Sequence, residues 1–136
     1  MLVVDCSVAA AWALSDEAAD WTRAARAAVE RDGIVVPWFF WFEIRSILVV
    51  SERRGRIDIS DVERFIDELP KLIAIVDDKP DSAAVMRLAR SHQLTAYEAA
   101  YLELASRMKL MLSTLDGQLI AAAPKAGVNL WSPEDK

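Results

Sequence analysis

Four acidic residues stand at positions from which side chains can reach a common site. Asp5 follows the apolar run LVV, and Asp116 follows LSTL. Glu43 and Glu98 each fall in the first turn of a helical pattern, on the side that carries apolar residues. A buried carboxylate needs a partner, because removing an unpaired charge from water is very costly. These four side chains are therefore the candidates for chemistry.

Carboxylates without histidine or cysteine are the ligands of hard cations such as Mg²⁺ or Mn²⁺. Two unit charges 4 Å apart repel by about 4 kcal/mol at an effective dielectric constant near 20. Four carboxylates would therefore gather only around a cation, or with raised pKa values. The single histidine, His92, ends a helical pattern, so histidine-based nucleophilic chemistry is poorly supported. The single cysteine, Cys6, is expected to be a buried, inert thiol.

Each acid also has a structural interpretation that involves no ligand. Aspartates at strand ends form turns and cap helices, which covers Asp5 and Asp116. Glu43 would be stabilised by the positive N-terminus of its helix. Thr95 and Glu98 have the spacing of a capping box, in which the glutamate accepts a hydrogen bond from the N-cap backbone. Both interpretations remain open for all four acids.

Two further patterns bear on Glu98. Ser60-Asp-Val-Glu63 has the same capping-box spacing, which predicts a second helix start of this kind. In the helix that contains Glu98, the pair Glu103 and Arg107 lies about 140° and 180° away from it, so the pair is expected to mark the solvent side.

The elements that would position these residues alternate along the chain. Five strands are expected at Leu2–Asp5, Ile34–Pro37, Leu72–Val76, Met111–Leu115 and Val128–Trp131. Helices are expected near 7–14, 16–31, 40–54, 60–69, 81–92, 95–109 and 117–125. Near-continuous apolar strands between helices predict an α/β fold with a parallel sheet covered on both faces. Ligands bind at the carboxyl ends of such strands, where Asp5 and Asp116 stand.

Length and composition predict one domain, 1–136, in a chain of 136 residues with 54% hydrophobic residues. The N-terminal segment lacks the basic start of a signal peptide, and no apolar run approaches the ~20 residues of a membrane span. A cytoplasmic location away from membranes is therefore expected. The net charge of −5 argues against a protein that coats nucleic acid by bulk attraction.

The chain resembles the PIN-domain ribonucleases of the VapC toxin type over essentially its whole length. The motifs that carry the resemblance are VVDCSV, PWFFWFEIRSIL, LTAYEAAYLELA and LSTLDGQL, in this order and spacing. The resemblance implies a three-layer α/β/α fold and a metal-dependent endoribonuclease. Asp5, Glu43, Glu98 and Asp116 would hold Mg²⁺ or Mn²⁺, with Ser7 and Thr114 as polar residues beside them. At position 98 the family usually has aspartate, and the longer glutamate differs from that pattern.

The resemblance also implies partners: an RNA substrate, a second copy in a homodimer, and a VapB-type antitoxin whose segment covers the acidic pocket. Arg45, Arg53, Arg54 and Arg56 are candidates for contacts with RNA phosphates. An alternative is a catalytically weak or inactive PIN-fold dimer that acts as a binding module. The five consecutive aromatic residues 38–42 would then serve as an interaction surface.

A phosphoacceptor receiver domain is a further alternative, suggested by Asp77 and Asp78 after an apolar run. It is disfavoured, because receiver domains resemble one another in a lysine that ends the last strand. Here Ser132 and Pro133 follow that strand.

Overall fold

A computed structural model describes residues 1–14 and 19–133. Its centre is a four-stranded parallel sheet in the order β3-β2-β1-β4. The strands are β1 (Leu2–Val4), β2 (Ile34–Pro37), β3 (Ile73–Asp77) and β4 (Leu112–Ser113). Four of the five expected strands are therefore confirmed, with β4 shorter than its apolar run.

The fifth expected strand, Val128–Trp131, is wrong as a strand. Leu130 makes only an isolated parallel bridge to Leu112, flanked by hydrogen bonds from Leu112 N–H to Asn129 and from Trp131 N–H to Leu112. The neighbouring β4 has only two residues, so it offers little edge for further pairing. Pro133 then ends the segment, because proline has no backbone N–H to donate.

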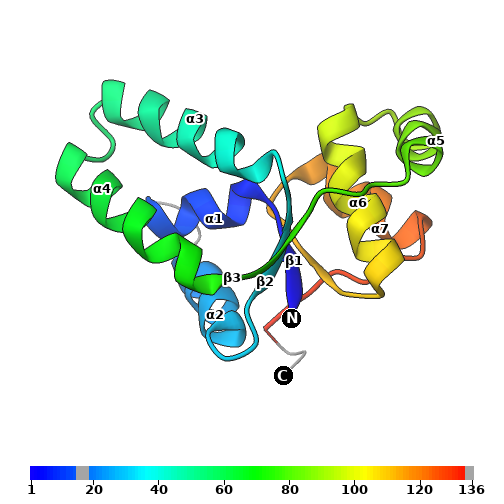
Figure 1. Cartoon of the computed structure of the whole chain (residues 1–136), viewed down its shortest axis with the longest axis horizontal. Coiled ribbons are helices and arrows are strands. Elements are labelled where there is room, and N and C mark those ends of the chain that lie inside the picture. The colour runs from blue at the N-terminus through cyan, green and yellow to red at the C-terminus, as the bar shows by residue number, and fades with distance from the viewer. Residues whose placement is uncertain (15–18, 134–136) are drawn as a thin grey trace.

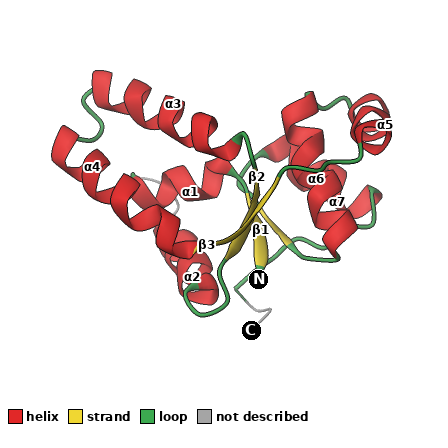
Figure 2. Ribbon diagram, in the orientation of Figure 1, coloured by secondary structure: helices red, strands yellow, loops and turns green. Residues whose placement is uncertain are grey.

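Helices cover both faces of the sheet. Helices α1 to α4 lie on one side and α5 to α7 on the other, with the strands between them (Figures 1 and 2). The helices are α1 (Cys6–Ala13), α2 (Ala19–Val29), α3 (Phe40–Arg53), α4 (Ile59–Glu68), α5 (Ser82–His92), α6 (Ala96–Met108) and α7 (Gly117–Lys125), and a 3₁₀ turn, η1, spans Leu69–Leu72. This arrangement confirms the three-layer α/β/α PIN-like fold. The expected start of the second helix, at 16–18, lies outside the described residues.

The two inner strands form the centre of the core. Val3, Val4, Ile34 and Val35 have essentially no exposed surface, as expected for a parallel sheet covered on both faces. At the start of β2, Gly33 has a φ of +84°, and a Cβ there would lie 2.8 Å from the Ala74 side chain. Glycine is therefore required where β2 meets β3.

Helix α4 begins earlier than its capping-box pattern predicts. Its N-cap is Asp58, whose Oδ1 accepts hydrogen bonds from the Asp61 N–H at 2.9 Å and the Ser60 hydroxyl at 2.8 Å. The predicted Ser60–Glu63 capping box is therefore wrong. A carboxylate two residues upstream takes the N-cap role and uses Ser60 as a donor.

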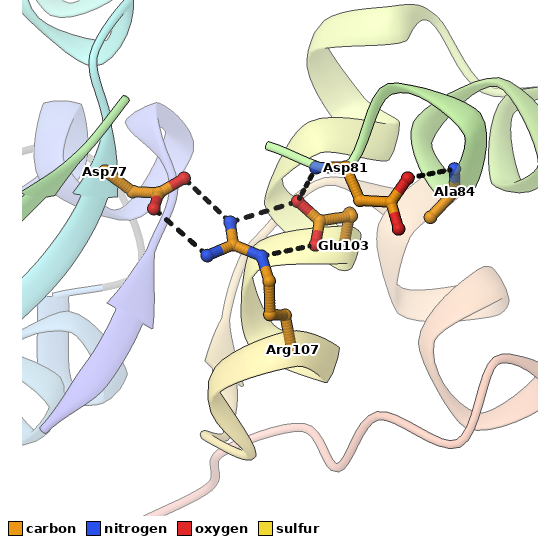
Figure 3. A network of polar contacts seen from close by, with 5 residues as sticks. All are labelled: Asp77, Asp81, Ala84, Glu103 and Arg107. Carbon is orange, nitrogen blue, oxygen red and sulfur yellow. Dashed lines mark hydrogen bonds and ion pairs between the residues drawn. The ribbon is translucent and has the colours of Figure 1, made fainter. Parts of the chain in front are cut away.

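The expectation that Glu103 faces solvent is also wrong. Glu103 is only 3% exposed, because α5 packs against α6 on that side. Arg107 donates to Glu103 at 2.7 and 3.1 Å and to both carboxylate oxygens of Asp77 at 3.1 and 2.7 Å (Figure 3). The periodicity of one helix does not show which neighbouring helix will cover it.

Among the described residues, no helix has both the length and the apolar character needed to cross a lipid bilayer.

Candidate metal and active site

The carboxyl ends of β1 and β4 bring two predicted acids together. The strands are neighbours, with Val4 paired to Ser113, so Asp5 and Thr114 emerge side by side. The Thr114 hydroxyl donates to Asp5 Oδ2 at 2.5 Å and accepts the Asp116 N–H at 3.0 Å. One threonine therefore links the two aspartates at the carboxyl ends of the strands, where ligands of parallel sheets bind.

Ser7 completes this arrangement, which we call the Asp5 cluster: Asp5, Ser7, Thr114 and Asp116. The Ser7 hydroxyl donates to Asp5 Oδ1 at 2.5 Å and accepts the Leu115 N–H at 2.8 Å. It therefore connects α1 to the segment that follows β4. The structure thus places the predicted polar residues Ser7 and Thr114 on the same carboxylate.

Both aspartates also cap helices, so the structural interpretation of each is confirmed. Asp5 Oδ1 accepts the Ser7 and Val8 N–H groups at the start of α1, at 3.1 and 3.3 Å. Asp116 Oδ1 accepts the Gln118 and Leu119 N–H groups at the start of α7, at 2.8 and 3.2 Å. Capping uses one oxygen of each carboxylate, so it does not exclude a second role.

Asp5 is a buried carboxylate, with 6% of its surface exposed. Burial raises the pKa of Asp5 above its usual value, and the nearby negative charge of Asp116 raises it further. Hydrogen bonds from Ser7, Thr114 and the Val8 N–H offset part of this rise in pKa. A bound cation would favour the charged form of Asp5 and so lower its pKa again. Carboxyl groups with perturbed pKa values are common at functional sites.

Glu43 lies in the first turn of α3 and forms a second group with two residues from other helices. The Tyr101 hydroxyl donates to Glu43 Oε1 at 2.7 Å. The Cys6 Sγ lies 3.5 Å from that oxygen and 3.5 Å from the Tyr101 hydroxyl. Cys6 is buried, as expected, and burial raises the pKa of its thiol.

The site residues that the sequence predicts do not include Tyr101. A signal for it exists in the sequence, because it shares the apolar side of its helix with Glu98 and has a hydroxyl that needs a partner when buried. The identity of that partner depends on the packing of α6 against α3, which the sequence does not show.

Glu98 forms the predicted capping box. Its Oε1 accepts the Thr95 N–H at 2.8 Å, and its own N–H donates to the Thr95 hydroxyl at 3.1 Å. The residue is half-buried rather than fully enclosed by the apolar side of α6. Both of these hydrogen bonds are to Thr95, and the role of Glu98 as a metal ligand stays a prediction.

Within the described residues, no three side chains of His, Cys, Asp or Glu are grouped so that they alone could hold a metal ion. The Asp5 cluster nevertheless offers carboxylate and hydroxyl oxygens, which are the kind of donor atom that Mg²⁺ and Mn²⁺ prefer. Mg²⁺ commonly uses one or two protein carboxylates and keeps water or substrate phosphate in its other positions. Asp116 Oδ2 accepts no hydrogen bond from the described residues, and Asp5 Oδ2 accepts only one, so both aspartates retain free lone pairs.

No protein-family model matches the chain, and no curated protein matches it. Solved structures do match it, among them two crystal structures. The crystal structure of PAE2754 from Pyrobaculum aerophilum has 25% identity and a TM-score of 0.70, covering 89% of this chain and 83% of that one. The crystal structure of FitAcB from Neisseria gonorrhoeae has 17% identity and a TM-score of 0.69, covering all of both chains. Both likenesses agree with the PIN-like fold.

Proposed function

We propose that this chain is a metal-dependent endoribonuclease, the toxin of a VapBC-type toxin–antitoxin pair. The observation that carries the proposal is the Asp5 cluster at the carboxyl edge of a parallel sheet. There a buried carboxylate with a raised pKa shares a threonine with a second aspartate. Acids gathered in this way suit a divalent cation better than histidine-dependent chemistry.

Asp5 and Asp116 are the proposed direct ligands of Mg²⁺ or Mn²⁺, and Glu43 is the third acid of the site. When bound, the ion would activate water and neutralise charge on the scissile phosphate. Ser7 and Thr114 hold the Asp5 carboxylate in one orientation through two 2.5 Å hydrogen bonds. Such orienting contacts to a ligand typically contribute strongly to metal affinity.

The RNA substrate must be held by local positive charge, since the whole chain has a net charge of −5. Arg53 and Arg54 are exposed at the end of α3. Arg45 lies with its guanidinium 3.6 Å from the centre of the Trp41 ring and donates to the Trp41 carbonyl. These arginines are the proposed phosphate contacts. By the family resemblance, the protein acts as a homodimer that a VapB-type antitoxin inhibits.

The second candidate function is a binding module with weak or no catalysis. It is favoured by the capping role of Glu98, because the carboxylate at this position, which by the family resemblance would bind metal, is engaged at the start of α6. It is also favoured by Trp38, Trp41 and Phe42, which are more than half exposed and border a hollow of about 650 Å³. An exposed aromatic surface of this kind is typical of interaction sites.

Binding of Mn²⁺ and cleavage of RNA by purified protein separate the two candidates. The variants are Asp5→Asn, Asp116→Asn and the matched control Asp58→Asn, which alters another helix N-cap. The nuclease proposal expects Mn²⁺ binding and cleavage in the wild type and the control, with loss of both in the first two variants. Wild-type cleavage in EDTA contradicts the proposal. Failure of the wild type to bind Mn²⁺ supports the binding module.

A further inference from the structure

Three residues from distant parts of the chain meet beside the Asp5 cluster. Cys6 comes from the first turn of α1, Glu43 from the first turn of α3, and Tyr101 from the middle of α6. Tyr101 is 3% exposed and Cys6 is 8% exposed, so both side chains are removed from water. Cys6 directly follows Asp5, which places this group next to the proposed metal ligands.

The hydrogen bonds of this group converge on one oxygen. The Tyr101 hydroxyl donates to Glu43 Oε1 at 2.7 Å, and the Cys6 thiol lies 3.5 Å from the same atom. A phenol and a thiol each carry one hydrogen that can be donated, and Glu43 Oε1 is the carboxylate oxygen that both approach. Among the described residues, none donates to the other oxygen of Glu43, which is left available.

The Tyr101 ring is itself held in place. Phe39 packs edge-on against it with ring centroids 5.7 Å apart, and Phe39 is buried in the turn before α3. The phenol therefore has a fixed direction, whereas Glu43 lies on a half-buried helix turn with three rotatable side-chain bonds. A rigid donor beside a flexible carboxylate restricts the carboxylate more than the carboxylate restricts the donor.

We propose that Tyr101 is a positioning residue for Glu43. Its hydroxyl fixes one carboxylate oxygen of Glu43 and thereby keeps the other oxygen available to the proposed cation site, with Cys6 as a second, weaker donor. This inference rests on the proposed function, because the orientation of Glu43 affects activity only if Glu43 helps to bind a cation. Donors that orient a metal ligand typically contribute about 10–100-fold in affinity.

The test compares Tyr101→Phe with Tyr97→Phe, measuring Mn²⁺ affinity by calorimetry or electron paramagnetic resonance. Tyr97 stands one turn earlier on α6, is 58% exposed, and also contacts Phe39, so its substitution is a matched loss of one hydroxyl. We expect Tyr101→Phe to weaken Mn²⁺ binding about 10-fold. We expect Tyr97→Phe to change Mn²⁺ affinity by less than about 2-fold, since its hydroxyl is outside the group that holds Glu43.

A double-substitution cycle separates positioning from a general effect on folding. In a Glu43→Gln background, Tyr101→Phe should weaken Mn²⁺ binding little further, because the group that it orients is already changed. Equal losses in both backgrounds overturn the positioning role. Thermal unfolding of every variant checks that the folded state is the one measured. If Tyr101→Phe does not fold, Cys6→Ala tests the same group and should weaken Mn²⁺ binding by a smaller factor.

The outcomes also separate this inference from the proposed function. Wild-type Mn²⁺ binding that is lost in Asp5→Asn but unchanged in Tyr101→Phe overturns the positioning role and leaves the metal site standing. The absence of Mn²⁺ binding in the wild type overturns both. The expected pattern, loss in Tyr101→Phe but not in Tyr97→Phe, supports both.

Discussion

Asp5 has two opposing effects on the protein. Its side chain caps α1 and accepts hydrogen bonds from Ser7 and Thr114, which favours its position. Burial raises the pKa of Asp5, which means that the charged carboxylate is less stable in the folded protein than in water. Acids that function in catalysis are commonly kept in such an environment, at some cost to stability.

Replacing Asp5 with asparagine should therefore stabilise the metal-free protein at neutral pH. Because the pKa of Asp5 is raised in the folded protein, the wild type has its full stability from protonated Asp5 only below the unfolded-state pKa. It loses this stability as the pH rises through the folded-state pKa and the buried carboxyl group gives up its proton. Asparagine is neutral throughout and still caps a helix well. The advantage of Asp5→Asn should grow as pH rises from about 4 to 7, measured as the unfolding temperature without metal.

The matched Asp58→Asn variant should lack this growth, because Asp58 is an exposed cap whose pKa is lowered by its hydrogen bonds. An unfolding temperature for Asp5→Asn that falls below the wild type as pH rises would contradict the prediction.

Glu98 allows its two roles to be tested separately. Glutamine at the third helical position also serves in a capping box, so Glu98→Gln keeps the cap and removes the charge. The structure shows Glu98 in the capping box, and glutamine can accept the same hydrogen bond from the Thr95 N–H. We therefore expect Glu98→Gln to change neither the Mn²⁺ affinity nor the unfolding temperature. Glu98→Ala should lower the free energy of unfolding by about 0.5–1 kcal/mol, as the loss of a cap does.

Calorimetry with Mn²⁺ and thermal unfolding give both readings from one preparation. A loss of Mn²⁺ affinity in Glu98→Gln would show that Glu98 is a metal ligand as well as a cap, as the family resemblance implies.

At the scale of elements, Arg107 joins the edge strand to two helices. It lies on α6, pairs with Asp77 at the end of β3, and pairs with the buried Glu103. Glu103 Oε1 also accepts the Asp81 N–H at 3.3 Å, at the start of α5 (Figure 3). The strand-to-helix connection after β3 is thus fastened at both its ends to α6.

Replacing Arg107 with methionine should destabilise the fold, because it leaves the Glu103 carboxylate buried without its cation. Removing one partner of a buried pair costs about 3–5 kcal/mol, and the partial exposure of Arg107 reduces this to about 2–3 kcal/mol. The double variant Glu103→Gln with Arg107→Met should recover part of the loss, since the unpaired charge is gone.

Urea unfolding of the two variants measures the difference. Arg64→Met is a suitable control, because Arg64 forms an exposed pair with Asp61 that should contribute at most about 1 kcal/mol. Equal destabilisation in the single and double variants would contradict the role of the buried charge.

At the scale of the whole molecule, the charge distribution decides how RNA could bind. The chain is acidic overall, and the Asp5 cluster adds negative charge at the place where the proposed function would put the scissile phosphate. Arg53 and Arg54 lie at the exposed end of α3, whereas α5 lies across the sheet from them (Figure 1). Productive binding of RNA would depend on a few local arginines together with the cation.

Replacing Arg53 and Arg54 by alanine should flatten the salt dependence of RNA binding. Each contact with a single-strand phosphate adds about 0.7 to the slope of log affinity against log salt, so the loss of two contacts should lower it by about 1.4. Arg87→Ala with Arg90→Ala, on α5, is the matched double control and should leave the slope unchanged. Filter binding across a series of salt concentrations measures this slope. Equal slopes in the wild type and in the Arg53/Arg54 variant would show that these two arginines do not contact RNA phosphates.

Local patterns were sufficient for most of the fold. The apolar runs at Leu2–Val4 and Ile34–Pro37 became the buried inner strands, and the Thr95–Glu98 spacing became a capping box. These features depend on residues within a few positions of one another. The Val128–Trp131 strand failed because strand pairing also needs a neighbour long enough to pair with.

What the sequence alone determined is the alternation of strands and helices, and with it the placing of Asp5 and Asp116 at the carboxyl edge of a parallel sheet. Only the tertiary structure decided which side chains meet there. It buried Glu103 under α5, joined Asp5 to Asp116 through Thr114, and set Tyr101 against Glu43. The physical reason is that periodicity fixes the face of an element on which a residue lies, whereas its partner depends on how separate elements pack.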